Sequence, residues 1–138
     1  KKIAKFNPSA KIYSGACPLF VPFIEEGEIN SPALKLIAKD YLRPLKGKID
    51  TLIMGCTHYP IIEKIISKEV GSKVKLVNPG ELVAQEIAIF LKDLGLLNSQ
   101  KGRGDVWYFV TDLTKRFTKM AEMFLGKKIN HKLQKIEL

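Results

Sequence analysis

The chain has 138 residues, of which 46% are hydrophobic and 27% are charged, so it is long enough for one compact domain and has the composition of a soluble globular protein. Its apolar runs are much shorter than a membrane span, and its two cysteines exclude a framework of several disulfides, so we expect no membrane partner and reduced thiols in the cytoplasm. The net charge of +9 would suit a polyanion. The basic residues are dispersed, however, and no nucleic-acid-binding signature accompanies them, so we expect no specific nucleic-acid partner.

The first part of the chain predicts short elements. Residues 1–7 are lysine-rich and indicate the tail of a truncated helix, and we expect the start of the chain to be a cut rather than a signal peptide. Residues 11–15 predict a short strand. The apolar residues 19–24 predict a single turn or short helix at the rim of a crevice, closed by Glu25 and its acidic neighbour.

A longer helix is predicted next, with Ser31 as its N-cap and Pro32 at its first helical position. Apolar residues recur at helical spacing over residues 34–42 and give this helix one buried face, until Pro44 and Gly47 end it. The pattern indicates packing rather than chemistry.

The centre of the chain predicts a strand, a loop and a helix in direct succession. Residues 52–54 are a short apolar run that predicts a buried strand, and Gly55 permits the turn that follows. Apolar residues at helical spacing then predict a helix over residues 60–70, ended by Gly71. Residues 56–58 therefore lie in the loop between the end of a parallel strand and the start of a helix.

This loop is where we expect chemistry. Open α/β sheets bind ligands where strand ends and helix N-termini converge on one crevice. The backbone N–H groups and the dipole of the following helix favour an anion there, either a substrate carboxylate or the thiolate of Cys56 itself.

The next segment predicts a second strand and helix. Residues 74–77 are apolar on both faces, as expected of a parallel strand buried between layers of helices. Residues 78–80 then lead into a helix. Six of its apolar residues are expected to point inward: Leu82, Val83, Ile87, Phe90, Leu91 and Leu94.

The last segment begins with a polar, glycine-rich stretch at residues 98–104, which predicts a linker. Residues 106–110 predict a strand. Asp112 is expected to cap the helix that follows, and Gly126 is expected to end it. Residues 132–138 predict a terminal edge strand. The helix has an apolar stripe made of Phe117, Met120, Ala121, Phe124 and Leu125.

Several stretches resemble one enzyme family. The sequence GCTHYP at residues 55–60, preceded by LIM, is similar to the second catalytic motif of glutamate racemases, which interconvert L- and D-glutamate. The resemblance covers nearly the whole chain and corresponds to the C-terminal half of a typical racemase. The other matching stretches are ACPLFVPFIEEG at residues 16–27, YLRPLKGKID at 41–50, LVNPGE at 76–81 and YFVTD at 108–112.

The resemblance implies a mechanism and roles for particular residues. Racemisation needs one base on each face of the α-carbon, one to remove the proton and one to deliver it. The resemblance implies that Cys56 is one of two cysteine bases, and that Thr57 and His58 bind the substrate. It also implies that His58 assists proton transfer and that Glu25 assists the histidine. No cofactor is implied, and no lysine has the context of a pyridoxal phosphate site.

The resemblance also sets expectations for the whole molecule. The fold is expected to be α/β, a parallel sheet flanked by helices that forms one lobe of a two-lobed racemase, plus a C-terminal strand–helix segment. Residues 1–98 would form the catalytic lobe, and residues 99–138 would be a return segment that completes an absent N-terminal lobe. Because the second cysteine base belongs to that lobe, we expect the chain alone to be inert. The family further implies a homodimer that supplies D-glutamate for bacterial peptidoglycan, and hence for cell wall biogenesis and cell shape.

Other interpretations stay open. Cys17 also follows a predicted strand and could pair with Cys56 as a second base, although we favour Cys17 as a small buried residue. A cysteine hydrolase using Cys56 and His58 has no evident third member, and a metal site from both thiols and His58 lacks the usual spacings. An aspartate or hydantoin racemase is the alternative within the superfamily, and a basic polyanion-binding module is the non-enzymatic one.

Overall fold

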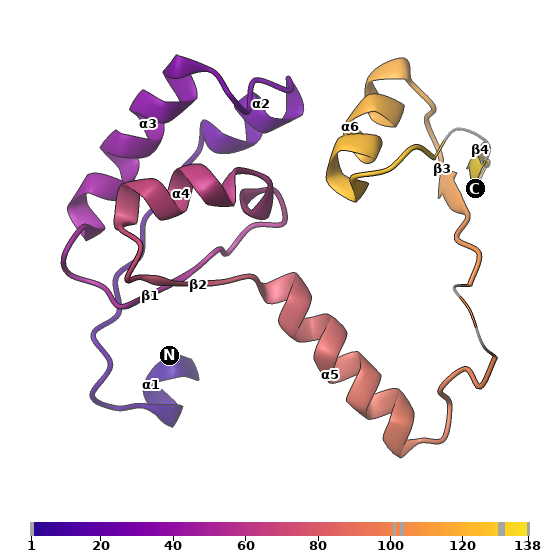
Figure 1. Ribbon diagram of the computed structural model, residues 1–138, viewed down its shortest axis with the longest axis horizontal. Coiled ribbons are helices and arrows are strands. Elements are labelled where there is room, and N and C mark those ends of the chain that lie inside the picture. Colours follow the sequence, from indigo (N-terminus) through magenta and orange to yellow (C-terminus); the bar gives the residue numbers. More distant parts are fainter. Residues whose placement is uncertain (1, 101, 103, 130–131, 138) are drawn as a thin grey trace. The chain divides into compact units, whose positions relative to one another are not determined.

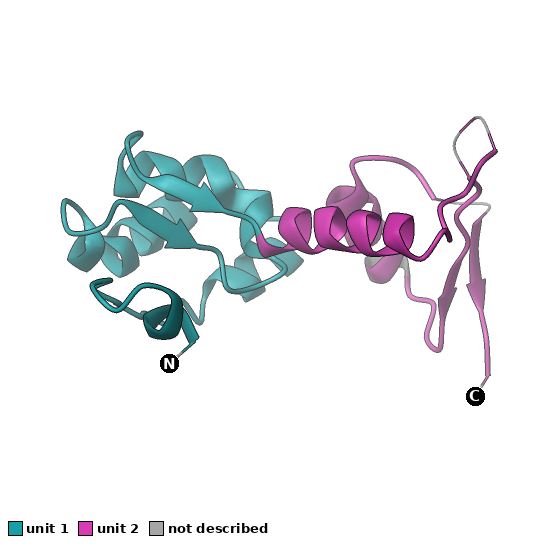
Figure 2. Ribbon diagram, turned by 90° about the horizontal axis from the view of Figure 1, so that it is seen from below, with its two compact units in different colours: residues 1–78 teal, residues 79–138 magenta. Residues whose placement is uncertain are grey.

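The computed structural model describes residues 2–100, 102, 104–129 and 132–137. The chain divides into two compact units, Lys1–Asn78 and Pro79–Leu138 (Figure 2). Each unit combines helices with one pair of parallel strands, which confirms the predicted α/β class (Figure 1). The units do not coincide with the predicted boundary between residues 98 and 99, which concerns the lobes of a longer protein and stays a prediction.

The sheet of the first unit pairs β1 (Thr51–Ile53) with β2 (Lys75–Val77) in parallel, with Leu52 opposite Leu76. The ladder continues at both ends, because Lys75 N–H donates to the Asp50 carbonyl at 2.8 Å and Met54 N–H donates to the Val77 carbonyl at 3.0 Å. Both predicted strands are confirmed, with β1 one residue earlier than expected. The sheet therefore holds the chain firmly up to the residue before Gly55.

Helices α3 (Pro32–Leu42) and α4 (Glu63–Val70) pack against each other in this unit. Ser31 caps α3 as predicted, since its hydroxyl accepts the Leu34 N–H at 3.1 Å. Two 3₁₀-helices, η1 (Arg43–Leu45) and η2 (Tyr59–Ile62), extend α3 and precede α4. The core of the unit consists of Phe20, Ile24, Leu34, Ala38, Leu42, Met54, Ile62, Ile66 and Val70.

The N-terminal part contains α1 (Lys2–Phe6) and α2 (Phe20–Glu25), both as expected. The strand predicted at residues 11–15 is wrong, because these residues adopt neither helix nor strand. Ile12 and Tyr13, the two large apolar residues of this segment, are about half exposed, at 53% and 48%, so no neighbouring strand or helix covers them fully. A strand needs a neighbouring ladder as well as a suitable sequence.

Two further expectations for this unit need correction. The helix predicted from residue 60 begins as the 3₁₀-helix η2 and becomes α-helical only at Glu63. The sheet was expected to be buried between layers of helices, but Ile53 is 53% exposed and Lys75 is exposed. The face of the sheet that carries Thr51, Ile53 and Lys75 is therefore exposed.

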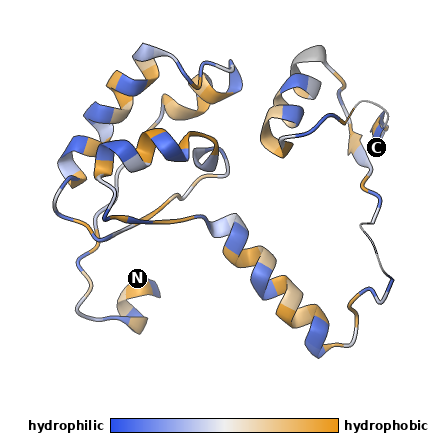
Figure 3. Cartoon of the chain, viewed as in Figure 1, coloured by the Kyte–Doolittle hydropathy of each residue, from blue (hydrophilic) through white to orange (hydrophobic). Residues whose placement is uncertain are grey.

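The second unit begins with α5 (Pro79–Asp93), the helix predicted after residues 78–80, although Leu94, expected among its residues, lies just past its end. The prediction that its apolar residues point inward is wrong, because α5 has no buried residue, and Phe90, for example, is 62% exposed. In Figure 3, orange apolar stretches alternate with blue polar ones along this helix. The helical pattern indicates which face needs a partner but not whether that partner is present.

The remainder of the second unit is a strand–helix–strand arrangement. Strand β3 (Tyr108–Val110) pairs in parallel with β4 (Leu133–Lys135), which confirms the terminal strand within its described part. Helix α6 (Lys115–Leu125) connects them and ends at Gly126, whose φ of 62° suits glycine. Asp112 is not the cap: the hydroxyl of Thr114 accepts the Phe117 N–H at 3.0 Å, because Thr114 directly precedes the helix.

The linker predicted at residues 98–104 has no helix or strand at residues 98–100, 102 and 104, whereas residues 101 and 103 lie outside the described part. No helix in the described part of the chain has both the length and the apolar character that crossing a membrane requires.

Candidate active site

A tight loop carries the three predicted site residues away from the end of β1. Met54 is buried, and its carbonyl accepts the Cys56 N–H at 2.8 Å. The Cys56 carbonyl in turn accepts the Tyr59 N–H at 3.3 Å, which starts η2. These backbone hydrogen bonds place Cys56, Thr57 and His58 between a paired strand and a helical turn, as the sequence predicts.

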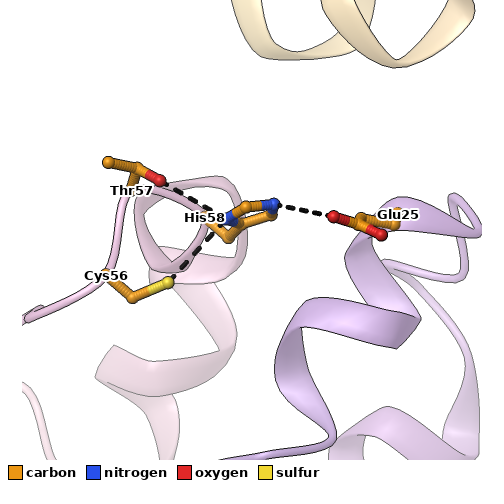
Figure 4. A network of polar contacts seen from close by, with 4 residues as sticks. All are labelled: Glu25, Cys56, Thr57 and His58. Carbon is orange, nitrogen blue, oxygen red and sulfur yellow. Dashed lines mark hydrogen bonds and ion pairs between the residues drawn. The ribbon is translucent and has the colours of Figure 1, made fainter. Parts of the chain in front are cut away.

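The imidazole of His58 lies between a thiol and a carboxylate (Figure 4). Its Nδ1 is 3.8 Å from Cys56 Sγ and 3.4 Å from Thr57 Oγ1. Its Nε2 is 3.3 Å from Glu25 Oε1, although Glu25 and His58 are 33 residues apart in the sequence. The structure therefore brings together all four residues that the sequence analysis singled out, and their roles stay predictions.

The position of Glu25 follows from α2. This short helix buries Phe20 and Ile24 in the core, and Glu25 is its last residue. Glu25 therefore extends from the edge of the core toward His58, with 38% of its side chain exposed against 22% for the imidazole. At this exposure the ion pair is partly solvated, so it orients the ring more than it stabilises the fold.

The arrangement defines a route for one proton. When the ionised carboxylate of Glu25 accepts a hydrogen bond from Nε2–H, the neutral ring has its lone pair on Nδ1. That nitrogen can accept the proton of the Cys56 thiol, which leaves a thiolate beside an imidazolium. Glu25 then stabilises the imidazolium at its other nitrogen. Thr57 adds a hydroxyl at the same side of the ring.

Cys17 differs from Cys56 in its surroundings. Both thiols are free, so no disulfide joins them, and both are half-buried. Burial raises the pKa of the Cys17 thiol. The thiolate rather than the thiol acts as a base, and a raised pKa leaves less Cys17 thiolate. The raised pKa therefore favours Cys17 as a packed side chain over Cys17 as a second base beside Cys56.

Metal binding by these residues was another interpretation of the sequence. Among the residues that the structure describes, no group of three or more His, Cys, Asp or Glu side chains is arranged to hold a metal ion. The site that would combine both thiols with His58 is therefore not assembled in them.

One residue of the loop was assigned no role in the chemistry from the sequence. The ring of Tyr59 stacks edge-on against Phe20, with ring centroids 5.4 Å apart, and its hydroxyl donates to the Cys17 carbonyl at 3.4 Å. Burial, followed by the charges of Cys17 and Cys56, raises the pKa of Tyr59. An aromatic residue directly after the histidine is the only sequence signal for these contacts.

Comparison with known proteins identifies relatives but no matching family model. The chain is 45% identical to glutamate racemase 2 of Caldanaerobacter subterraneus subsp. tengcongensis over 129 residues, which cover 93% of this chain and 48% of that protein. It is 40% identical to the glutamate racemase of Chlorobaculum tepidum, over 92% of this chain and 47% of that protein. The predicted resemblance is confirmed, and the chain spans about half the length of the curated relatives it matches.

Solved structures agree with the sequence comparison. Glutamate racemase from Francisella tularensis, in complex with D-glutamate, matches with a TM-score of 0.85 at 37% identity, over 99% of this chain and 51% of that one. A glutamate racemase isoform from Bacillus anthracis matches with a TM-score of 0.86 at 31% identity, over 99% of this chain and 50% of that one.

Proposed function

We propose that this chain is the C-terminal half of a glutamate racemase and supplies one of its two catalytic bases. The observation that carries the proposal is the position of the His58 ring between two partners. Its Nδ1 is 3.8 Å from Cys56 Sγ, and its Nε2 is 3.3 Å from Glu25 Oε1. It is supported by the similarity to half of each glutamate racemase, including one whose structure holds D-glutamate.

The chemistry on this side of the substrate follows from the contacts. His58 accepts the thiol proton of Cys56, and the resulting thiolate abstracts the proton from the α-carbon of D-glutamate. The C–H electron pair becomes the carbanion, whose charge the substrate carboxylate delocalises, and the new S–H bond holds the proton. In the opposite direction the Cys56 thiol delivers its proton to the carbanion formed from L-glutamate.

Thr57 is proposed to bind the substrate. Its hydroxyl lies 3.4 Å from His58 Nδ1 on an exposed part of the loop, and its backbone N–H lies just before η2, so a bound carboxylate can reach both groups. His58 is proposed to bind the substrate as well, as the resemblance to glutamate racemases implies, because its ring lies 3.4 Å from the Thr57 hydroxyl.

The other base must approach the opposite face of the α-carbon. We assign it to the half of the relatives that this chain does not match, which makes the chain inert by itself. The complete protein would need no pyridoxal phosphate, because two protein bases perform the transfer. A cytoplasmic homodimer that supplies D-glutamate for peptidoglycan is part of the same proposal and is inferred from the family.

The experiment compares two proteins of verified mass. The first is the 138-residue chain, and the second is the complete racemase proposed to contain it. Circular dichroism follows the conversion of L-glutamate. We expect no conversion by the chain, conversion by the complete protein, and loss of conversion in Cys56→Ala but not in the matched variant Cys17→Ala. Racemisation by the chain alone would contradict the proposal and favour Cys17 and Cys56 as the two bases.

A further inference from the structure

Tyr59 touches the start of α2 in two ways. Its ring packs edge-on against Phe20, the first residue of the helix, at an interplanar angle of 83°. Its hydroxyl donates to the Cys17 carbonyl, which also accepts the Phe20 N–H at 3.1 Å. The same carbonyl thus joins the first turn of α2 to the side chain of Tyr59.

His58, the residue before Tyr59, contacts the other end of α2. Helix α2 has six residues, and His58 contacts Glu25, the last of them, at 3.3 Å. At a rise of about 1.5 Å per residue, Phe20 and Glu25 are roughly 7–8 Å apart along the helix axis. Two consecutive residues, His58 and Tyr59, therefore contact opposite ends of α2.

The two contacts differ in strength. The contact between His58 and Glu25 is a single polar contact with 22% and 38% of the side chains exposed, so water competes for both groups. Phe20 is only 1% exposed, and its ring also contacts Tyr41 of α3, with centroids 5.5 Å apart. The buried aromatic contact is the better anchor, because it is fixed by packing on several sides.

We infer that Tyr59 is a positioning residue for the site: by fixing the start of α2 against η2, it holds Glu25, at the end of α2, in reach of His58. As a positioning residue, Tyr59 contacts neither the thiol proton nor the substrate. It acts through the orientation of α2 and therefore through the Glu25 carboxylate. For racemisation the inference rests on the proposed function, whereas the geometry that it concerns is independent of it.

The variants separate the ring, the hydroxyl and general stability. Tyr59→Leu removes the ring and the hydroxyl, and Tyr59→Phe removes only the hydroxyl, whose 3.4 Å hydrogen bond is long. The matched control is Tyr41→Leu, because Tyr41 is the other ring on Phe20 but belongs to α3 rather than to the loop that carries His58.

The first readout is the ¹⁵N signal of the His58 imidazole in the 138-residue chain, assigned by its absence in His58→Gln. We expect Tyr59→Leu to displace the Nε2 signal in the same direction as Glu25→Gln, and Tyr59→Phe and Tyr41→Leu to leave it near the wild-type position. An unchanged signal in Tyr59→Leu would overturn the inference, and so would an equal displacement in Tyr41→Leu. If Tyr59→Leu fails to fold by circular dichroism, Tyr59→Met, a flexible side chain that fills irregular gaps, takes its place.

The second readout is racemisation by the complete protein. We expect Tyr59→Leu to lower kcat about tenfold with KM little changed, because proton transfer is affected more than binding, and Tyr59→Phe to recover most of the loss. An equal loss of kcat in Tyr41→Leu would assign the effect to stability and contradict the inference. If the wild-type protein does not racemise glutamate, the proposed function fails, while the imidazole signal still decides the role of Tyr59.

Discussion

At the scale of single residues, the two ring nitrogens of His58 have different neighbours. Nδ1 faces the Cys56 thiol at 3.8 Å and Nε2 faces the Glu25 carboxylate at 3.3 Å. The carboxylate fixes the tautomer, and the tautomer decides which nitrogen can receive the thiol proton. In the proposed function, we therefore expect removal of the Glu25 charge to affect proton transfer without removing a ligand of the substrate.

Glu25→Gln tests this dependence in the complete racemase. The amide oxygen can still accept the Nε2–H hydrogen bond, but the negative charge that stabilises the imidazolium is lost. We expect kcat to fall about 10- to 100-fold with a smaller change in KM, measured by circular dichroism of L-glutamate. The control is Glu26→Gln, which removes the same charge one position along the chain. Equal losses in both variants would show that net charge, not the contact with His58, is responsible.

The thiol of Cys17 gives a second test at this scale. Burial raises its pKa, so at a given pH the folded chain has less Cys17 thiolate than the unfolded chain. In the Cys56→Ala variant, where Cys17 is the only thiol, we expect alkylation by iodoacetamide at about pH 8.5 to be slower in the native chain than in urea.

The same shift has a consequence for stability. Unfolding releases a proton once the pH exceeds the ordinary thiol pKa, so the contribution of Cys17 is complete below that pH and is lost as the pH rises through the raised pKa. Equal alkylation rates in buffer and in urea would contradict the shift.

At the scale of elements, helix α3 shows how one face supports the core. Leu34 is fully buried, whereas Leu36 of the same helix is 66% exposed. We expect Leu34→Ala to lower the free energy of unfolding by about 2–5 kcal/mol, since it leaves a cavity, and Leu36→Ala to change it by less than about 0.5 kcal/mol. Urea unfolding of the two variants makes the comparison. Similar losses would mean that α3 is not packed as described.

The sequence predicted elements well where the signal is local. Ser31 followed by Pro32 marked the start of α3, and Gly126 marked the end of α6, because caps and turns depend on neighbouring residues. The prediction of Asp112 as the cap was wrong, because Thr114 is an equally suitable residue type and is the one that directly precedes the helix.

Long-range features were predicted less well. Residues 11–15 were predicted as a strand but have no neighbouring strand to pair with in the described part of the chain, and α5 has an apolar face that is exposed along its length. The contact between Glu25 and His58 spans 33 residues. No spacing rule connects them, so only the resemblance to glutamate racemases suggested it. Neither the residue pattern nor the resemblance suggested the contacts that Tyr59 makes with Phe20 and Cys17.

At the scale of the whole molecule, the largest departure from an ordinary globular protein is the exposed apolar face of α5. Leu82, Val83 and Ile87 are each more than half exposed. A helix with one uncovered apolar face normally packs against another element. In the proposed function the surface belongs to a protein about twice as long, so the isolated chain has apolar surface in contact with water.

Dye binding tests this expectation. We expect the 138-residue chain to bind the apolar dye ANS strongly, and the double variant Ile87→Lys with Phe90→Lys to bind much less, because both side chains are exposed and tolerate charge. The control for added charge is Gln85→Lys, which introduces a lysine at an exposed polar position of the same helix and leaves its apolar residues in place. Weak dye binding by the wild-type chain would mean that α5 is covered, for example by a second copy.

The strand registers also order the events of folding. Thr51 pairs with Lys75, and Tyr108 pairs with Leu133, so each sheet closes a loop of similar and modest length. The contacts at the site close longer loops, of 33 residues from Glu25 to His58 and 42 from Cys17 to Tyr59. Closing a longer loop costs more entropy, by less than about 0.6 kcal/mol here, which slightly favours formation of both sheets before assembly of the site. On dilution from denaturant, we therefore expect the strand amides to become protected from exchange before His58 contacts Glu25 at the end of α2.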